Sequence, residues 1–361
     1  MKSDYMIFDY TDADELAQKY GYSIVDVLLI AINRYGVRAD REDKRIRFKL
    51  KLDLYYEKYY MAVCVNTCDS PFVLVDNMLL LNEKVIGEIF EIEKDTCDTT
   101  YFRRNKTELT LNSNKRSHCY GCTFCGTYNL QAEDQVDLSS EDKIDNYIKE
   151  YLVKNSVKDL SDLVRVTLCT GCFGNEKNLV AHIISVYKVL REYGFNKRIR
   201  YIGSQIRSDE AMQTIAKNIP YFSLSLTVEC FSNRKERMRK EKGALELSDI
   251  HVLLRRSLLY GFSTNYLYIC GLDELNTLKD GVIMLSDCIN RLPIFQVMQN
   301  YEERHEELRV EEAKGVEYYL EARKIVEEVF LNTNLKPRSW ENYRSLFYNT
   351  YQNNPYNCMR I

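Results

Sequence analysis

The sequence predicts an α/β fold in which a partial, TIM-like barrel of six β-α units follows a small α+β domain. From about residue 105 onward, short apolar runs alternate with segments that repeat apolar residues at helical spacing. Strands separated by helices form parallel sheets with right-handed crossovers, and six units are fewer than the eight of a closed TIM barrel. The expected domains are residues 1–104, the barrel over 105–300 and a helical extension over 301–361.

The composition narrows the class of protein. The chain has 361 residues, 12 of them cysteine, with a formal net charge of −3 and 29% charged residues. A negative net charge excludes a positive electrostatic field over the whole molecule that would attract nucleic acid. The longest apolar runs are too short to span a membrane. The opening MKSDYMIFDYTDADEL is too acidic for a signal peptide. Scattered cysteines without a signal peptide are typical of a reducing cytoplasm, which is the expected location.

The small domain over 1–104 is expected to mix one helix with several strands. Apolar residues at helical spacing predict a helix over 12–34, and strand-like segments cover 45–56 and 59–65. The segment 85–92 fits either a strand or a short helix. This domain is interpreted either as a module that binds substrate or a partner, or as a lid over one end of the open barrel.

The six β-α units follow one another closely along the chain. The first helix begins with Ser-Ser-Glu-Asp, which is typical of a helix N-terminus. The second has a broad apolar face and stops at Gly194. The expected strands are 109–112, 164–168, 200–202, 221–228, 265–269 and 294–298, and the expected helices are 139–155, 175–193, 208–217, 235–240, 248–260, 274–291 and 301–330.

A cluster of three cysteines follows the first predicted barrel strand in the segment SHCYGCTFCGTY, at Cys119, Cys122 and Cys125. An odd number of closely spaced thiols does not form a disulfide framework. Thiolates at this spacing suit a soft metal, and three are one fewer than a fully ligated iron–sulfur cube requires. The alternatives are a zinc site completed by His118 or a distant cysteine, and buried free thiols. Candidates for a second metal site, or for buried thiols, are Cys64, Cys68 and Cys97.

With this segment the chain resembles the radical S-adenosylmethionine (radical SAM) superfamily. The usual signature of that superfamily is CxxxCxxC, with an aromatic residue before the last cysteine, on the loop after the first barrel strand. Cys122-Thr123-Phe124-Cys125 matches the second half, whereas Cys119 lies one residue closer than usual and His118 stands where the first cysteine normally falls. The resemblance implies a [4Fe–4S] cluster held by Cys119, Cys122 and Cys125, with Phe124 beside the cofactor.

A second segment of the resemblance follows the second predicted strand. There the superfamily has a Gly-Gly-Glu-like segment that holds the methionine amine of SAM, and Gly174-Asn175-Glu176 stands in that place. Backbone carbonyls and a carboxylate are acceptors for an ammonium, and glycine lets the backbone approach it. The same residues also fit a helix N-terminus, with Asn175 as the cap and Glu176 in the first turn. The two roles are compatible.

The loop after the fourth predicted strand is where superfamily members often hold the ribose and carboxylate of SAM. Glu229 and Asn233 suit hydroxyl groups there. A bidentate guanidinium suits the carboxylate, and Arg234, Arg237 and Arg239 are the candidates. The alternative for these arginines is a solvated helix face that holds i,i+4 ion pairs.

The loop after the fifth predicted strand resembles the IxGxxE segment that packs on adenine in many superfamily members. Ile269, Gly271 and Glu274 match that segment.

Four cysteines outside the triplet, Cys169, Cys172, Cys230 and Cys270, lie at or just beyond predicted strand ends. Cys172 and Cys270 are candidate hydrogen donors to a product radical. Packing in the wall is the more common role for such a thiol. Cys169 and Cys172 also have the spacing of a zinc half-site.

The resemblance implies an enzyme in which cluster-bound SAM is reductively cleaved to a 5′-deoxyadenosyl radical that abstracts hydrogen from the substrate. The C-terminal segment lacks a cysteine-rich extension, which favours a small-molecule substrate. An electron donor such as flavodoxin or ferredoxin is the expected partner, with no nucleic acid or membrane involved. One alternative is modification of a ribosomal peptide bound by residues 1–104. An alternative of another class is a zinc-stabilised binding protein without catalysis.

Overall fold

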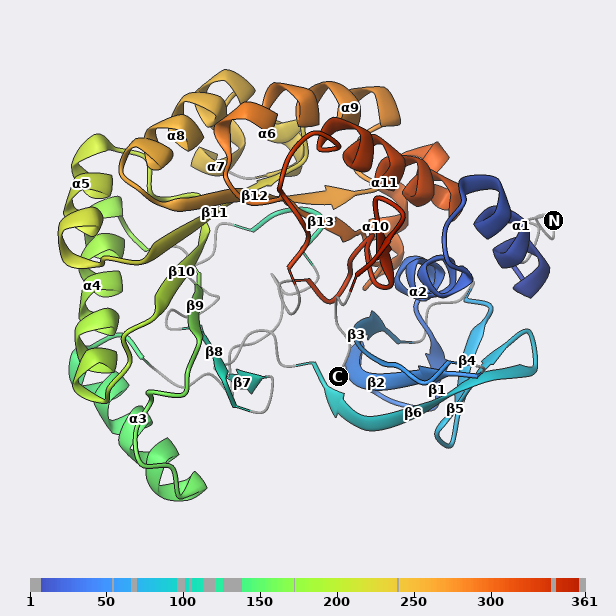
Figure 1. The fold of residues 1–361 in the computed structure, drawn as a ribbon, viewed down its shortest axis with the longest axis horizontal. Coiled ribbons are helices and arrows are strands. Elements are labelled where there is room, and N and C mark those ends of the chain that lie inside the picture. The colour runs from blue at the N-terminus through green and yellow to red at the C-terminus, as the bar shows by residue number, and fades with distance from the viewer. Residues whose placement is uncertain are drawn as a thin grey trace.

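The computed structural model describes residues 8–53, 55–65, 70–95, 101–103, 106–112, 121–125, 138–171, 173–238, 240–338 and 342–356. Two β-sheets dominate this part of the chain (Figure 1). The larger sheet curls, and its helices lie around the outside of the curve. None of the helices in these residues is long and apolar enough to cross a membrane.

The larger sheet has seven strands in the spatial order β13-β12-β11-β10-β9-β8-β7. The strands β8 to β13 run parallel to their neighbours, and β7 pairs antiparallel with β8 as an edge strand that the sequence did not predict. The ends of the six predicted strands differ by at most two residues from β8 to β13. The strands are β7 (Tyr101–Arg103), β8 (Glu108–Leu111), β9 (Arg165–Cys169), β10 (Arg198–Gly203), β11 (Phe222–Glu229), β12 (Ser263–Cys270) and β13 (Ile294–Val297).

Helices connect the parallel strands. The helix predicted over 274–291 is shorter, because the chain leaves it at Leu285 and makes a 3₁₀ turn over Ser286–Cys288. The helix predicted over 235–240 is replaced by two short helices on either side of Met238, which is extended. The helices are α3 (Glu141–Asn155), α4 (Glu176–Glu192), α5 (Asp209–Asn218), α6 (Arg234–Arg237), α7 (Lys240–Ala244), α8 (Leu247–Leu259) and α9 (Leu275–Met284).

The long helix predicted over 301–330 is wrong. The chain forms α10 (Glu303–Glu307), a 3₁₀ turn over Glu311–Lys314 and α11 (Glu317–Val329). The break has a tertiary cause, because the Val310 N–H donates to the Gly271 carbonyl (3.0 Å) and the Arg309 guanidinium donates to the Met298 carbonyl (3.1 Å). The Val310 bond replaces the intrahelical bond that its N–H would make in a continuous helix, and the Arg309 side chain ties the same turn to the residue after β13.

Residues before β7 form a six-stranded sheet in the order β1-β4-β5-β6-β2-β3, with two helices. The helix predicted over 12–34 is divided at Gly21, which adopts the left-handed conformation (φ 68°) that favours glycine and ends the first helix. Ser23 then caps the second helix. The elements are α1 (Tyr10–Tyr20), α2 (Ile24–Tyr35), β1 (Arg38–Ala39), β2 (Arg45–Leu52), β3 (Lys58–Cys64), β4 (Phe72–Val75), β5 (Met78–Leu81) and β6 (Lys84–Lys94).

Buried polar contacts join the first sheet, the larger sheet and the C-terminal residues. Helix α2 contacts both β3 and β13 (Figure 1). The Asp26 carboxylate is fully buried, lies 3.3 Å from the Arg323 guanidinium, and accepts backbone N–H groups of residues 348–350. Gln299, just after β13, donates to Asn33 and to the Ala62 carbonyl. The last strands of the described residues are β14 (Thr350–Tyr351) and β15 (Asn354–Pro355), which form a hairpin.

Candidate functional site

The cysteine loop lies against the loop that follows β11. A single antiparallel bridge pairs Cys122 with Met238. The Thr123 N–H donates to the Arg237 carbonyl at 2.9 Å, and the Thr123 hydroxyl donates to the same oxygen at 3.2 Å. More than 100 residues of sequence separate the two loops, and both follow strands of one parallel sheet. The contact therefore places Cys122 and Cys125 at its carboxyl edge, where barrel enzymes of this kind carry their active sites.

An apolar cluster brings two predicted cofactor-binding residues together. Phe124, which lies between the two cysteines, is 8% exposed and belongs to a buried cluster with Ile269 from the end of β12. Aromatic and aliphatic side chains of this kind form the dry walls of small-molecule sites. The other buried members of the cluster are Cys230, Met238, Leu272 and Met298.

A lysine lies near the two described thiols and is paired with a glutamate. The Lys242 ammonium donates to the Glu229 carboxylate at 2.7 Å, and both side chains are largely buried. Burial by itself lowers the pKa of Lys242, but Glu229 and the thiols of Cys122 and Cys125 outweigh it, so the pKa is raised above its ordinary value. Lys242 thus supplies positive charge next to sulfur atoms, which bind metals as thiolates.

Glu229 is held in an unusual backbone conformation. Its φ is 70°, and the register between β11 and β12 shifts between Thr227 and Glu229. A non-glycine residue in the left-handed region costs free energy, and such residues gather at functional sites. The bulge turns the end of β11 so that the Glu229 carboxylate meets Lys242. Among the predicted cofactor-binding residues of this loop, Glu229 is the one that meets the cysteine environment through Lys242.

Asp273 organises the loop that supports the cysteines. Its side chain is 1% exposed. One carboxylate oxygen accepts the Phe231 N–H (2.7 Å) and the Tyr268 hydroxyl (2.9 Å). The other accepts the Ser232 N–H (3.0 Å) and lies 3.2 Å from the Arg237 guanidinium. Because the Arg237 carbonyl accepts from Thr123, Asp273 acts on the cysteine loop through this chain of contacts. Sequence reasoning placed Asp273 within the adenine segment and missed this role.

Arg234 is buried rather than solvated, and its donors are directed at the backbone. It donates to the carbonyls of Val228 (2.6 Å), Cys230 (2.5 Å), Leu245 (3.0 Å) and Lys242 (3.4 Å). These bonds use four of the five guanidinium N–H groups. They favour a role in holding the loop over the predicted role in binding the SAM carboxylate, and they exclude the solvated-face interpretation for this arginine.

Two other predicted residues of the β11 loop are placed differently. Asn233 precedes α6 with φ 49° and makes no capping bond with its side chain. Arg237 is largely buried and paired with Asp273. Arg239 lies outside the described residues.

The segment Gly174–Glu176 begins α4. The Asn175 side chain accepts the Asn178 N–H at 2.8 Å, so the capping role is confirmed. One carboxylate oxygen of Glu176 accepts the N–H groups of Arg207 and Ser208, at the start of α5. Glu176 therefore ties the loop after β9 to the loop after β10, and its predicted role toward the methionine amine is left to its second oxygen and to the Gly174 backbone.

Gly271 occupies a position that requires glycine. Its φ is 116°, and a Cβ there would lie 3.0 Å from the Tyr319 hydroxyl and 3.1 Å from an Arg309 nitrogen. The residue after the end of β12 thus lets the backbone turn beneath the C-terminal segment. This contact with Tyr319 and Arg309 explains the glycine without a cofactor, and its predicted role in the adenine segment stays a prediction.

Cys64, Cys230 and Cys270 are buried thiols, whereas Cys169 at the end of β9 is half-buried. Cys270 is fully buried in the main core, and burial raises the pKa of its thiol well above the ordinary value. Burial likewise raises the pKa of Cys230 and of Cys64 to about 12. These placements favour packing over the predicted hydrogen-donor role of Cys270. The candidates Cys68, Cys97, His118, Cys119 and Cys172 lie outside the described residues.

The solved structures that are similar to this chain include two radical SAM enzymes. No family model and no curated protein sequence matches the chain. The radical SAM methyltransferase TsrM from Kitasatospora setae, solved with cobalamin and a [4Fe–4S] cluster, is 12% identical with a TM-score of 0.35, and the match covers 50% of this chain and 34% of TsrM. The cobalamin-dependent SAM radical enzyme OxsB is 14% identical with a TM-score of 0.32, over 61% of this chain and 31% of OxsB.

The matches span about a third of each of these enzymes. At these TM-scores neither likeness assigns a fold or an activity to this chain. The chemistry of the site therefore rests on the residues of the chain itself.

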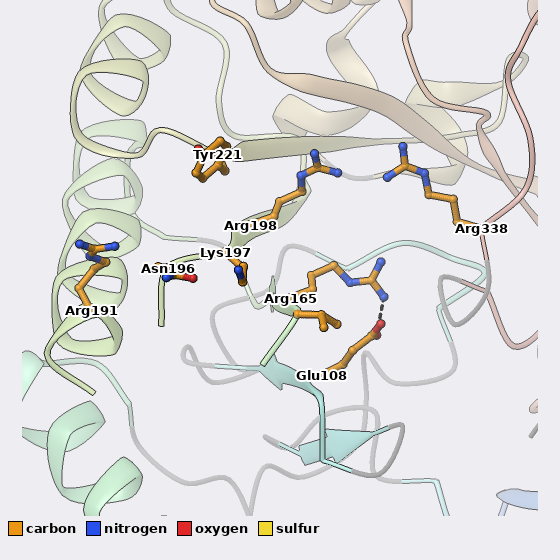
Figure 2. Close-up of a pocket in the computed structure, with 9 residues that line it drawn as sticks. Glu108, Arg165, Arg191, Asn196, Lys197, Arg198, Tyr221 and Arg338 are labelled. Atoms are coloured by element: carbon orange, nitrogen blue, oxygen red, sulfur yellow. Dashed lines mark hydrogen bonds and ion pairs between the residues drawn. The ribbon is translucent and has the colours of Figure 1, made fainter. Parts of the chain in front are cut away.

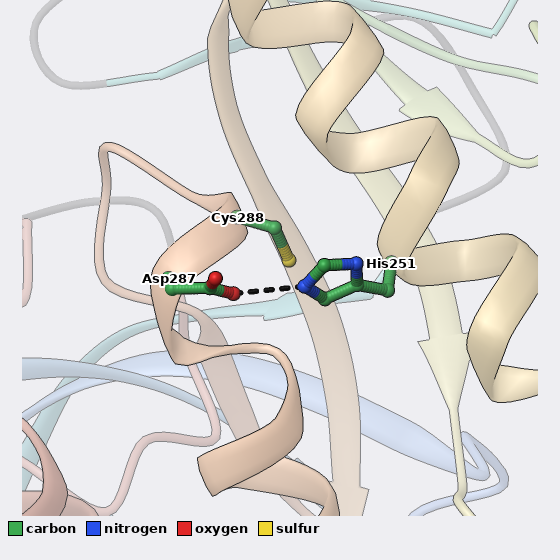
Figure 3. A group of neighbouring side chains, drawn as sticks. All are labelled: His251, Asp287 and Cys288. Carbon is green, nitrogen blue, oxygen red and sulfur yellow. Dashed lines mark hydrogen bonds and ion pairs between the residues drawn. The ribbon is translucent and has the colours of Figure 1, made fainter.

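Three side chains of types that can bind a metal also lie close together on the helical side of the larger sheet. His251 of α8 lies 2.9 Å from Asp287, and the Cys288 thiol lies close to both (Figure 3). Arg255 lies 3.3 Å from the second Asp287 oxygen, and burial raises the pKa of Cys288 to about 12. A neighbouring cation and a protonated thiol both oppose metal binding. This group is best described as an ion-pair cluster that joins α8 to the turn after α9.

Proposed function

We propose that the protein is a radical SAM enzyme whose [4Fe–4S] cluster is held by Cys119, Cys122 and Cys125 at the carboxyl edge of the larger sheet. The observation that carries the proposal is the position of the cysteine loop. It is braced against the loop after β11 and carries Phe124 into the same apolar cluster as Ile269. Two segments that the resemblance assigns to one cofactor, far apart in sequence, meet in space.

The donor set fits an iron–sulfur cluster. Thiolates are the ligands that such clusters prefer, and three of them leave one iron open. Within the described residues, no other histidine, cysteine or acidic side chain completes a ligand group with Cys122 and Cys125. A closed zinc site would need its remaining ligands from outside those residues.

The residues of the chain would have separate roles at the site. Held by the three thiolates, a [4Fe–4S] cluster would supply an electron and an open iron for the reductive cleavage of SAM. Lys242 offsets part of the negative charge that three thiolates bring into a largely buried site. Phe124, Ile269 and Met298 form an apolar wall that keeps water from a reactive species.

The substrate is proposed to be a small molecule. A ribosomal peptide bound by the first sheet is the alternative substrate. Reduction would come from a flavodoxin- or ferredoxin-like protein.

Metal analysis after anaerobic reconstitution tests the cluster. We expect about four iron and four sulfide per chain, and their loss when Cys119, Cys122 and Cys125 are all replaced by Ala. Cys288→Ala serves as the matched control, because this thiol is buried away from the site and should leave the cluster intact. Full loading of the triple variant, or one zinc without sulfide in the native protein, would overturn the assignment.

Product analysis tests the chemistry. With a strong reductant and SAM, the loaded protein should release 5′-deoxyadenosine slowly even without substrate. The triple cysteine variant should release none. Loaded, reduced protein that binds SAM and releases no deoxyadenosine with any candidate substrate would contradict the radical mechanism while leaving the cluster assignment in place.

A further inference from the structure

The ion pair of Lys242 and Glu229 is largely buried at the carboxyl edge of the larger sheet. The Lys242 ammonium donates to the Glu229 carboxylate at 2.7 Å, and the two side chains are 20% and 11% exposed. Glu229 is the last residue of β11, and Lys242 belongs to α7. A buried ion pair adds little net stability compared with apolar packing. Stability therefore does not explain the pair, and its position suggests a role in the site.

The backbone of Lys242 is fixed beside the cysteine loop. Cys122 forms an antiparallel bridge with Met238. Gly243, the residue after Lys242, packs so closely on Met238 that a Cβ at Gly243 would lie 2.4 Å from the Met238 carbonyl oxygen. The Lys242 carbonyl accepts from the Arg234 guanidinium at 3.4 Å. A continuous series of close contacts thus joins the lysine to the cysteine loop.

The charge of Lys242 acts on both described thiols of that loop. Its ammonium interacts with Cys122 and with Cys125, which are among the groups that raise its pKa. A Coulomb interaction is mutual, so the lysine stabilises negative charge at the two sulfur atoms by the same amount. Reduction of a cluster held by these sulfur atoms adds one negative charge at the same place. A cation there favours the reduced cluster, and a carboxylate paired with that cation opposes it.

We propose that the Lys242–Glu229 pair sets the reduction potential of the cluster, with Lys242 raising the potential and Glu229 lowering it. This inference rests on the proposed function, because it concerns a cluster held by Cys122 and Cys125. The role is electrostatic, since an ammonium has no lone pair with which to bind iron. The lysine makes it easier for a flavodoxin- or ferredoxin-like protein to pass one electron to the cluster. The carboxylate keeps the reduced cluster a strong enough reductant for SAM.

Redox titration of the reconstituted full chain without SAM tests the proposal, with the reduced cluster followed by electron paramagnetic resonance. Lys242→Gln removes the charge and keeps a hydrogen-bond donor for Glu229. At a fixed potential its ratio of reduced to oxidised cluster should fall about tenfold, which for a one-electron couple is a shift of about 59 mV to more negative potential. Glu229→Gln should shift the potential in the opposite direction. Lys242→Arg keeps the charge and should stay near the native value.

Two changes elsewhere serve as controls. Lys235→Gln removes an exposed lysine of the neighbouring helix α6, which is paired with Glu246 and screened by water. Arg165→Gln removes the cation of a largely buried pair with Glu108, at the first residues of β9 and β8 and therefore at the opposite ends of the parallel strands (Figure 2). It reports what the loss of a buried ion pair does by itself. Both controls should titrate as the native chain does.

The possible results separate this inference from the cluster assignment. Native potentials in loaded Lys242→Gln and Glu229→Gln, or shifts of the same sign in both, overturn the inference and leave the cluster in place. A native chain that takes up no iron and sulfide overturns the proposed function and this inference with it. If Lys242→Gln alone fails to load, Glu229→Gln decides, because a potential that does not rise in that variant overturns the inference.

Discussion

Replacing Asp273 by Asn is expected to loosen the loop that supports the cysteine motif. The two side chains have nearly the same shape, but Asn keeps only one oxygen and places an NH₂ group against donors. If the lost oxygen is the one facing Phe231 and Tyr268, a buried N–H and a buried hydroxyl lose their acceptor. The Arg237 guanidinium, which is 13% exposed, also loses its carboxylate.

The cost follows from these contacts. Each buried donor without an acceptor costs about 1–3 kcal/mol, and removing one partner of a buried ion pair costs about 3–5 kcal/mol in total. These contributions overlap, so we expect the free energy of unfolding to fall by about 3–5 kcal/mol. That is a large share of the roughly 5–15 kcal/mol by which typical proteins are stable.

Urea unfolding followed by circular dichroism measures the stability of Asp273→Asn, and iron and sulfide analysis measures its effect on the cysteine loop. Asp280→Asn is the control, because this acid is exposed on α9 and close to Asp273 in sequence. A loss of stability below 1 kcal/mol would refute the reasoning about the network. The expected loss of stability with full iron and sulfide content would show that Asp273 does not brace the cysteine loop.

Three further changes probe other parts of the structure. Gly271→Ala should lower the free energy of unfolding by about 1–3 kcal/mol, because its φ is unfavourable for alanine and the new Cβ would press on Tyr319. Gly315→Ala is the control and should keep the native stability, because a Cβ there meets no described atom. Asp26→Asn should lower the free energy of unfolding by about 1–3 kcal/mol in urea unfolding, because it removes an acceptor from backbone N–H groups of residues 348–350, while Arg323 keeps its ion pair with Glu327. Burial lowers the pKa of His182 to about 4, so its unfolded form binds more protons between pH 4 and 6.5. Native stability should fall across that window as pH decreases, and His182→Gln should reduce the slope of that fall by up to about 1.4 kcal/mol per pH unit.

Each of these three expectations has a contradicting result. Equal stability of the Gly271→Ala and Gly315→Ala proteins would show that the backbone adjusts at β12. A stable Asp26→Asn protein would show that the backbone N–H groups of residues 348–350 find other acceptors. An unchanged acid slope in His182→Gln would show that other groups account for the loss of stability between pH 6.5 and 4.

Local signals explain why most elements of the larger sheet could be predicted. Strand and helix ends depend on neighbouring residues, such as Asn175 at the start of α4 and the apolar run of β11. The errors arose where distant contacts override local preference. The break between α10 and α11 depends on bonds from Val310 and Arg309 to the ends of β12 and β13. In the small domain, Gly21 is a local signal for the end of α1, and the single helix predicted over 12–34 was wrong because it ran through this glycine.

In the candidate site too, some features follow from local sequence and others from the tertiary structure. The sequence by itself determined the order of strands and helices and the spacing of Cys122, Phe124 and Cys125, because these features belong to short stretches of chain. Only the tertiary structure decided that Lys242, paired with Glu229, lies near the thiols and that the Arg234 guanidinium donates to backbone carbonyls. Such neighbours are set by the strand order and packing of the whole sheet, and no short stretch of sequence encodes them.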